Sequence, residues 1–106
     1  GDFNTTATAA AIKTMRTYFE DAKLSAEQTT DVTLSTHFGF YYCEDESQLK
    51  TGKVIDYIFN TPGNTTVSTF KLIPTNTNIC PYGEYISDHC ALVANVTVAN
   101  YAIAEK

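Results

Sequence analysis

The sequence predicts an α+β domain, in which a mixed, mostly antiparallel sheet of about five strands packs against one main helix. Three observations support this prediction. Apolar residues at helical spacing follow a short polar loop, several later segments are rich in β-branched and aromatic residues, and turn residues separate those segments. With 106 residues the chain has the usual size of one domain with a single core.

The main helix is expected after the polar segment that follows Gly1–Asn4. Its apolar side chains recur at steps of three and four residues and form one stripe, made of Ile12, Met15, Phe19 and Ala22. Such a stripe is typical of a helix that packs on a sheet. Three hydroxyl side chains precede it as candidate N-caps, those of Thr5, Thr6 and Thr8.

Four later segments are predicted strands, and the strand end at Gly1–Asn4 would make a fifth. They are Val32–Tyr42, interrupted at His37 and Gly39, then Lys53–Phe59, Val67–Ile73 and Cys90–Ala99. Loops are expected at 44–50, 60–64 and 74–85, where acidic or turn-forming residues gather. Lys53–Phe59 carries apolar side chains on both faces, and one helix cannot cover both faces of such a sheet. A further layer is therefore expected.

Charge and composition limit the classes of partner. Twelve acidic and seven scattered basic residues give a net charge of -5, so the basic stripe that nucleic-acid binding needs is missing. Nucleic acid is still possible as a partner, but the distribution of charge does not support it. The sequence contains no apolar run of the roughly 18 residues that a membrane span requires. Abundant Thr and Asn with few Lys lean slightly toward an exported protein, and the localisation is otherwise unknown.

The cysteines do not indicate a zinc site. Cys43, Cys80 and Cys90 show no Cys-x-x-Cys spacing, and the chain has only two histidines. Cys80 and Cys90 could close a short loop as a disulfide, although a free buried cysteine is the more common state. The sequence leaves that pairing open.

Three polar clusters interrupt or end otherwise apolar segments. They are Asp2 with Asn4, Asp56 within the strongest predicted strand, and Asp88 with His89. Each alone has an ordinary explanation as a turn residue, a satisfied acceptor or a structural histidine. If the strands bring them to one end of a sheet, three carboxylates, a carboxamide and an imidazole would suit a divalent cation and a phosphate ester.

These clusters lie in motifs that resemble the endonuclease/exonuclease/phosphatase (deoxyribonuclease-like) family. Gly1-Asp2-Phe3-Asn4, Ile55-Asp56-Tyr57-Ile58-Phe59 and Ser87-Asp88-His89 are similar to three motifs of its C-terminal half, in the same order. Thr36-His37-Phe38-Gly39 is similar to a Thr-Phe-His-Gly segment of the family, with the aromatic residue and the histidine exchanged. The Cys90-Ala91-Leu92 that follows departs from the family's usual large residue and proline.

The resemblance implies one half of a two-layer β-sandwich flanked by helices, with residues 1–106 as a C-terminal half and so a fragment. It also implies a hydrolase that cleaves phosphodiesters or phosphomonoesters with Mg²⁺, or alternatively Mn²⁺, as cofactor. Further family ligands, an Asn, a Glu and a His or Tyr, belong to the first half. We therefore expect this chain alone to bind metal weakly and to turn over little.

The resemblance assigns a role to each candidate residue. Asp2 would position or deprotonate the attacking water, and Asn4 would bind a phosphate oxygen or the metal. His89 would contact the phosphate, while Asp56 would accept a hydrogen bond from its other ring nitrogen and fix its orientation. Asp88 would bind Mg²⁺ directly or through water. The implied catalytic set is Asp2, Asn4, Asp56 and His89, and the implied metal set is Asp2, Asn4, Asp88 and His89.

Two expectations concern partners and alternatives. An exposed inner sheet face would need either the missing N-terminal half or a second copy of the chain to cover it. Besides the phosphoester hydrolase, the sequence allows a non-catalytic binding or assembly module on the same fold, or a stand-alone α+β protein whose Asp and His residues are incidental. The substrate class, from nucleic acid to inositol phosphates, lipids or small phosphoesters, is not determined.

Overall fold

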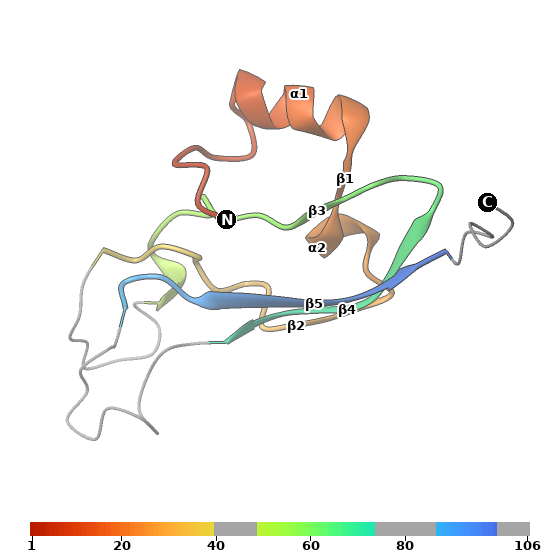
Figure 1. Cartoon of the computed structure of the whole chain (residues 1–106). Helices are drawn as coiled ribbons and strands as arrows, with labels where there is room; N and C mark the ends of the chain where they lie inside the picture. Colours follow the sequence, from red (N-terminus) through yellow and green to blue (C-terminus); the bar gives the residue numbers. More distant parts are fainter. Residues whose placement is uncertain (40–48, 74–86, 100–106) are drawn as a thin grey trace, which may run out of the picture.

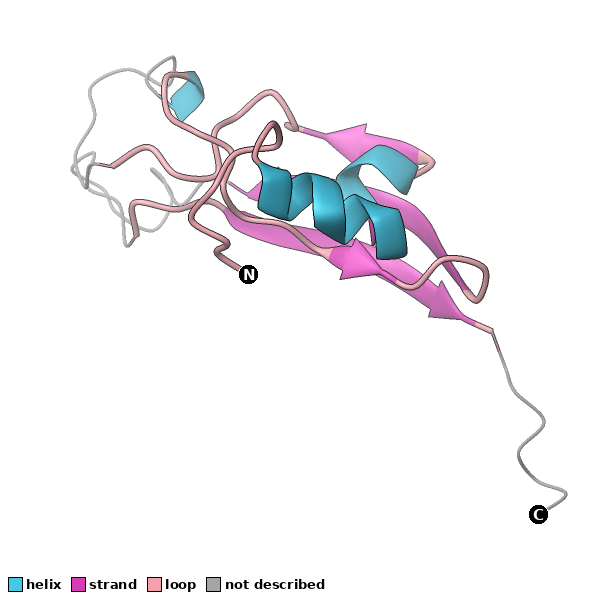
Figure 2. Cartoon of the chain, turned by 90° about the horizontal axis from the view of Figure 1, so that it is seen from above, coloured by secondary structure: helices cyan, strands magenta, loops and turns pink. Residues whose placement is uncertain are grey.

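The computed structural model describes residues 1–39, 49–73 and 87–99, and its elements lie in layers (Figure 1). Helix α1 (Ala10–Tyr18) lies above an extended segment that leads to β3 (Phe59–Asn60). Below this segment lies a sheet of β2 (Gln28–Thr30), β4 (Thr65–Ile73) and β5 (Ala91–Val98). The chain reaches it from α1 through β1 (Glu20–Asp21) and the short α2 (Ala22–Ser25). Seen from above, both helices lie over the strands (Figure 2).

The strands pair in two small sheets, and the mixed, mostly antiparallel α+β architecture is confirmed. In the larger sheet β4 pairs antiparallel with β5, from Thr65↔Val98 to Ile73↔Ala91, and β2 pairs parallel with β4. In the smaller sheet β1 pairs antiparallel with β3. The register of β4 shifts between Val67 and Thr69. This irregularity lets Val67 and Phe70, three residues apart, both face the core.

The core lies between the larger sheet and the segments above it. Its buried members come from all three described ranges: Ala22, Leu34, Phe38, Leu49, Val67, Phe70, Leu72 and Cys90. Buried and exposed side chains alternate along much of β4 and β5, because only one face of these strands is covered, and the covered face contributes the core residues of the sheet. Ile12 is fully buried in α1. Cys90 is a free cysteine, whereas its candidate partner Cys80 lies outside the described residues.

The predicted helix is shorter than its apolar stripe. Helix α1 ends at Tyr18, and Phe19 is 39% exposed. Asp21 explains the break, because its side chain accepts a hydrogen bond from the backbone N–H of Lys23 and caps the new helix α2. The expected threonine cap is wrong as well, since the N-cap of α1 is Ala9, without a side-chain hydrogen bond.

Two predicted strands are wrong as regular elements. Residues 32–39 of the first contain turns and two isolated bridges, both at His37, because Asp31 and Gly39 take positive φ angles of 57° and 79°. Of Lys53–Phe59, only Phe59 lies in a strand, and Lys53 and Asp56 make isolated bridges. The exposed strand β2 was not predicted. Residues 40–42 and the expected loops at 44–48 and 74–85 lie outside the described residues, but Leu49, at the end of the first loop, is buried.

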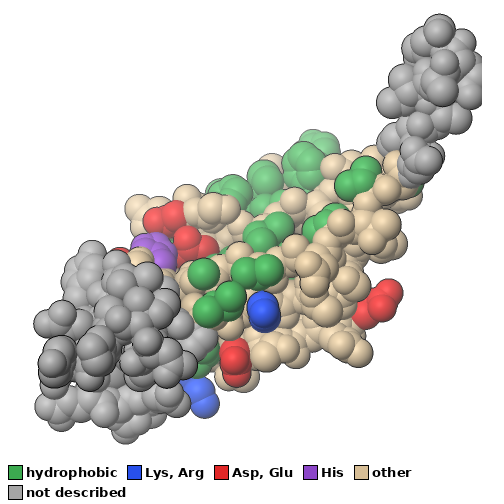
Figure 3. Space-filling model, turned by 60° about the horizontal axis from the view of Figure 1, so that its bottom comes forward, with side chains coloured by type: hydrophobic (Ala, Val, Ile, Leu, Met, Phe, Trp, Pro, Cys, Tyr) green, Lys and Arg blue, Asp and Glu red, His purple; other side chains and the backbone are tan. Residues whose placement is uncertain are grey.

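Some apolar side chains of the larger sheet are exposed. The lower face of the molecule shows them among polar ones (Figure 3). The large exposed apolar side chains of β4 and β5 are Ile73, Val93, Val96 and Val98. Within the described part of the chain, neither helix is long and apolar enough to cross a membrane.

Candidate active site

Backbone pairing brings the first residues of the chain beside the segment before β3. Asp2 and Asp56 form an antiparallel bridge, flanked by hydrogen bonds from Phe3 N to Ile55 O at 2.9 Å and from Tyr57 N to Gly1 O at 3.0 Å. The pairing stops because the chain turns at Asn4, whose φ is 53°. Asp2 and Asp56 therefore lie opposite each other on neighbouring segments.

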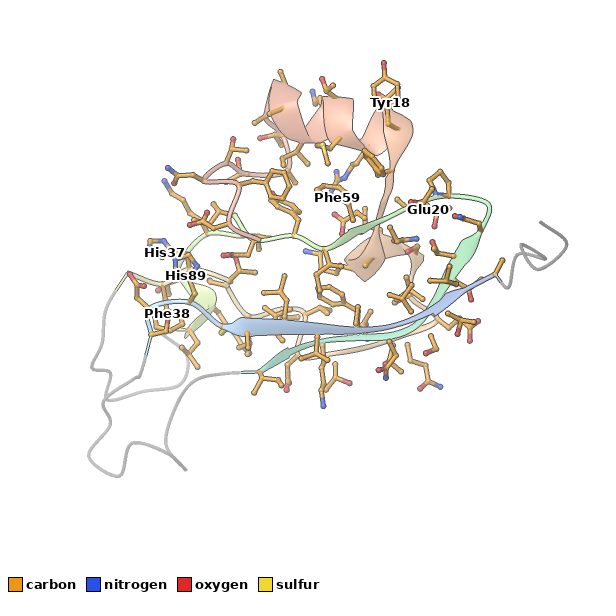
Figure 4. All side chains as sticks on the ribbon, in the orientation of Figure 1. Tyr18, Glu20, His37, Phe38, Phe59 and His89 are labelled. Carbon is orange, nitrogen blue, oxygen red and sulfur yellow. The ribbon has the colours of Figure 1, made fainter. Side chains whose placement is uncertain are left out.

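A second set of bridges adds Asp88 and His89 to the same region. His37 bridges both Lys53 and His89, so its segment lies between the other two. Backbone hydrogen bonds from Phe38 N to Asp88 O and from Cys90 N to Thr36 O, each 3.0 Å, fix this arrangement. Four segments far apart in sequence thus meet at one end of the molecule, where His37 and His89 lie together (Figure 4).

His89 is oriented by one short contact. Its Nδ1 lies 2.8 Å from Asp56 Oδ2, and the side chain of Asp56 is only 13% exposed. Its Nε2 lies 3.9 Å from Asp2 Oδ2 and also 3.9 Å from Asp88 Oδ1. These two separations are too long for hydrogen bonds. Nε2 therefore faces two carboxylate oxygens across a space that a further ligand atom can enter.

The other oxygen of each of these two carboxylates is already engaged. Asp2 Oδ1 accepts a hydrogen bond from the backbone N–H of Asn4 at 2.7 Å. Asp88 Oδ2 lies 3.1 Å from His37 Nε2. Each carboxylate is thereby held through one oxygen and presents the other toward His89. The contact at one oxygen fixes the orientation of each carboxylate, and the other oxygen can still accept a hydrogen bond or bind a cation.

His37 is a site residue that the sequence analysis missed. Besides its contact with Asp88, its ring lies 4.6 Å from the ring of His89, at an interplanar angle of 44°. The available signal was the family-like Thr36–Gly39 segment. The sequence analysis treated His37 only as an interruption of the strand predicted over Val32–Tyr42 and did not connect it with the candidate site.

Thr36 holds the backbone beneath Asp56. Its side chain is buried, and Oγ1 accepts hydrogen bonds from the backbone N–H groups of Ile55 at 2.9 Å and Asp56 at 3.1 Å. One hydroxyl thus satisfies two donors of a segment that has no regular strand partner there. The position of the Asp56 carboxylate depends on this support.

An open cleft adjoins the acidic cluster. It has a volume of about 330 Å³ and is lined by Asn4, Thr5, Thr6, His37, Lys53 and Ile55. Of the predicted site residues, the structure thus gathers Asp2, Asp56, Asp88 and His89 in one cluster and places Asn4 in this cleft. The roles assigned to these residues remain a prediction.

The donor set fits a hard divalent cation. Two triplets, His37 with Asp88 and His89, and Asp2 with Asp56 and His89, each offer ligand atoms within 4.8 Å of one another. Asp2 and Asp88 supply the oxygen ligands that Mg²⁺ prefers, and imidazole nitrogen is acceptable to Mn²⁺. Because Asp56 is engaged by His89 Nδ1, Asp2 is the better carboxylate ligand of its triplet, and Asp88 is the carboxylate of the other.

Two neighbouring groups are neutral near physiological pH. Burial raises the pKa of the Cys90 thiol from 9.0 to about 11, and the charge of Asp56 adds to this effect. Burial also raises the pKa of Tyr57, against the opposing effect of Arg16. The Tyr57 hydroxyl therefore stays protonated, and its one proton has two acceptors within reach, the backbone oxygens of Thr5 at 3.0 Å and Val54 at 3.1 Å. A neutral Cys90 is a poor nucleophile, so thiolate chemistry is not expected at this site.

Comparison with known proteins finds similarity at the level of structure. No protein-family model and no curated protein matches the chain. A conserved protein of unknown function from Enterococcus faecalis V583 is similar over 92% of this chain, with a TM-score of 0.70 and 26% identity. An endonuclease/exonuclease/phosphatase from Bacteroides vulgatus is similar over 92% of this chain, with a TM-score of 0.64 and 25% identity. The chain spans 34% of each of these two proteins.

Proposed function

We propose that this chain forms part of a metal-dependent phosphoesterase of the endonuclease/exonuclease/phosphatase type, which hydrolyses phosphodiesters or phosphomonoesters. The observation that carries the proposal is the arrangement around His89. Asp56 holds one ring nitrogen, while the other faces one oxygen each of Asp2 and Asp88. The fold similarity to the Bacteroides vulgatus protein supports the same class of reaction.

In the proposed reaction each of these side chains either accepts a proton or makes a hydrogen bond. Asp56 accepts from Nδ1–H of His89, which directs Nε2 to the reacting phosphate. When the ring is protonated, Nε2–H donates to a phosphate oxygen as negative charge develops there. Oδ2 of Asp2, which makes no hydrogen bond within the described residues, receives a proton from the attacking water. The carboxamide of Asn4 binds a non-bridging oxygen.

We propose Asp2, Asn4, Asp88 and His89 as the residues that would hold Mg²⁺ or Mn²⁺. Asp2 and Asp88 belong to two different triplets, and His89 is common to both. Once bound, such a cation neutralises phosphate charge and lowers the pKa of a coordinated water. Without it, the turned-in oxygens of Asp2 and Asp88 would repel an anionic substrate. The acidic character of the cluster is thus consistent with a phosphoester site only together with a cation.

The whole site is proposed to need more than these residues. The chain spans about a third of the two similar proteins, and apolar side chains of β4 and β5 are exposed. We propose that a missing N-terminal half, or a second copy of the chain, covers exposed apolar sheet surface and completes the ligand set. On this basis the chain alone binds metal weakly and is nearly inactive.

A metal titration tests the ligand assignment on the chain itself. Paramagnetic Mn²⁺ is expected to broaden the amide NMR signals of Asp2, Asp88 and His89 before all others. Asp88→Asn should weaken binding about tenfold or more, because a ligand carboxylate becomes neutral. Asp31→Asn is the matched control, since Asp31 is exposed and belongs to neither triplet. If Mn²⁺ broadens the amide signals of all acidic residues to the same extent, the assignment is wrong.

A turnover assay tests the reaction. A longer protein that contains this chain, at the length of the similar structures, is assayed with Mg²⁺ against bis(p-nitrophenyl) phosphate. His89→Ala should lower kcat at least a hundredfold, in the range typical of a lost acid–base or charge-stabilising group. Equal rates would remove His89 from the mechanism. Metal binding without any turnover of phosphoesters would favour a non-catalytic binding module on the same fold.

A further inference from the structure

The cleft beside the acidic cluster contains hydrogen-bond donors that have no partner among the described residues. Within the described residues, the Lys53 ammonium, the hydroxyls of Thr5 and Thr6 and the carboxamide of Asn4 make no hydrogen bond or ion pair. Among the described residues that line the cleft, Lys53 is the only charged one apart from the ionisable His37. Such a set of donors around one positive charge is suited to an anion that carries several acceptor oxygens.

The cleft adjoins the site around His89 through residues of its lining. Asn4 donates its backbone N–H to Asp2, and His37 contacts Asp88, so both cleft residues are directly attached to the acidic cluster. Lys53 is fixed to His37 by paired backbone hydrogen bonds of 2.9 and 3.0 Å. Three of the six lining residues are therefore held next to the cluster around His89.

The lining determines the chemical class of the ligand. Ile55 is the only apolar residue among the six, so an acyl chain in this cleft would bury an ammonium and several hydroxyls without partners. The volume of about 330 Å³ lies at the lower end for small-molecule pockets. It is large enough for a phosphate group and part of the unit that bears it.

We propose that this cleft binds a second phosphate group of the substrate, one that is not hydrolysed, with Lys53 as the main determinant. The proposal rests on the proposed function, because it takes the scissile phosphate to lie at His89. It narrows the substrate to compounds with two phosphate groups on one nucleotide or polyol unit. Lys53 makes no contact with the reacting atoms and acts in substrate binding.

Paired ligands that differ by one phosphate test the proposal on the chain itself. One pair is thymidine 5′-monophosphate and thymidine 3′,5′-bisphosphate, and the other is inositol 1-phosphate and inositol 1,4-bisphosphate. Each compound is titrated into the chain and followed by NMR, in a buffer that contains Mg²⁺ and no Mn²⁺. The second phosphate should tighten binding about three- to tenfold, as a charge-assisted contact does, in at least one pair. Lys53→Gln should abolish this gain and leave monophosphate binding unchanged. Lys50→Gln, an exposed lysine outside the cleft, should retain it.

The outcomes separate this proposal from the proposed function. Monophosphates that shift the signals of His89, with no gain from the second phosphate, overturn the cleft assignment and leave the site at His89 standing. If no phosphate compound shifts those signals, both proposals fail. A gain that survives in Lys53→Gln, or hexyl phosphate binding more tightly than either bisphosphate, also overturns the assignment. The pair in which the second phosphate tightens binding shows whether a nucleotide or a polyol carries the two phosphate groups.

Discussion

Replacing Thr36 with valine should separate the support of the site from its chemistry. Valine has the shape of threonine and suits extended backbone, so the substitution removes only the hydroxyl. That hydroxyl accepts the backbone N–H groups of Ile55 and Asp56 at 2.9 and 3.1 Å. The residue is 2% exposed, so water cannot easily replace the lost acceptor. Both N–H groups would be left without a partner.

The expected cost follows from the number of donors left unsatisfied. Each buried donor without a partner costs about 1 to 3 kcal/mol, and Asp56 N is only partly buried. We therefore expect the free energy of unfolding, measured in urea by circular dichroism, to fall by about 2 to 4 kcal/mol. The Asp56 backbone should also loosen. The Nδ1–H proton of His89, which contacts Asp56, should then exchange faster with water in NMR spectra.

Thr66→Val provides the matched control, because Thr66 is exposed in β4. Its free energy of unfolding should change by less than about 0.5 kcal/mol. If Thr36→Val costs no more than this control, the hydroxyl does not hold the segment beneath Asp56, and the account of how the site is positioned is wrong. A large cost with unchanged His89 exchange would restrict Thr36 to a purely structural role.

Three further changes have clear expected results. Gly52→Ala should lower the free energy of unfolding by about 2 kcal/mol or more in urea, because the added Cβ would overlap the backbone oxygen of His37; a neutral effect would disprove that packing. The pKa of Cys90 is raised in the folded chain, so the neutral thiol stabilises the fold at pH values below the ordinary thiol pKa of 9.0. As the pH rises toward about 11, the free energy of unfolding in urea should fall by at most about 2 to 3 kcal/mol. Cys90→Ala is the control, because it should remove this fall. Arg16→Met should cost about 1 to 3 kcal/mol in the same assay, because the carboxylate of Asp21, with a side chain 3% exposed, loses its ion pair; Lys13→Met, which removes an exposed cation of the same helix, should have little effect.

The parts of the fold that were predicted from sequence are those where one periodicity extends over most of an element. Val67–Ile73 and Cys90–Ala99 correspond closely to β4 and β5, because alternating apolar residues indicate each strand even though a register shift interrupts the alternation in β4. Helix α1 was found for the same reason. Its end was misplaced because Ala22 shares the helical spacing but belongs to α2.

Other errors have a tertiary cause that no local pattern records. β2 consists of Gln28, Thr29 and Thr30, all exposed, so it has no hydrophobic alternation and exists only through its parallel pairing with β4. His37 was not chosen as a site residue because its importance comes from its position between Lys53 and His89. Residues from separate segments can be recognised as neighbours only after the chain has folded.

The failure to form regular strands and the assembly of the site have the same origin. Of the isolated bridges in the described chain, one joins Asp2 to Asp56 and two join His37 to Lys53 and His89. In a continuous ladder these segments would run on in register, and their side chains would be spread along a sheet face. Single bridges instead let several chain segments cross at one place, so that carboxylates and imidazoles from distant parts of the sequence face one another. Asp56, which interrupts the apolar pattern of its segment, lies at such a crossing. A polar residue that breaks an otherwise regular strand pattern therefore indicated the site, and the same residue marks where the predicted strand does not form.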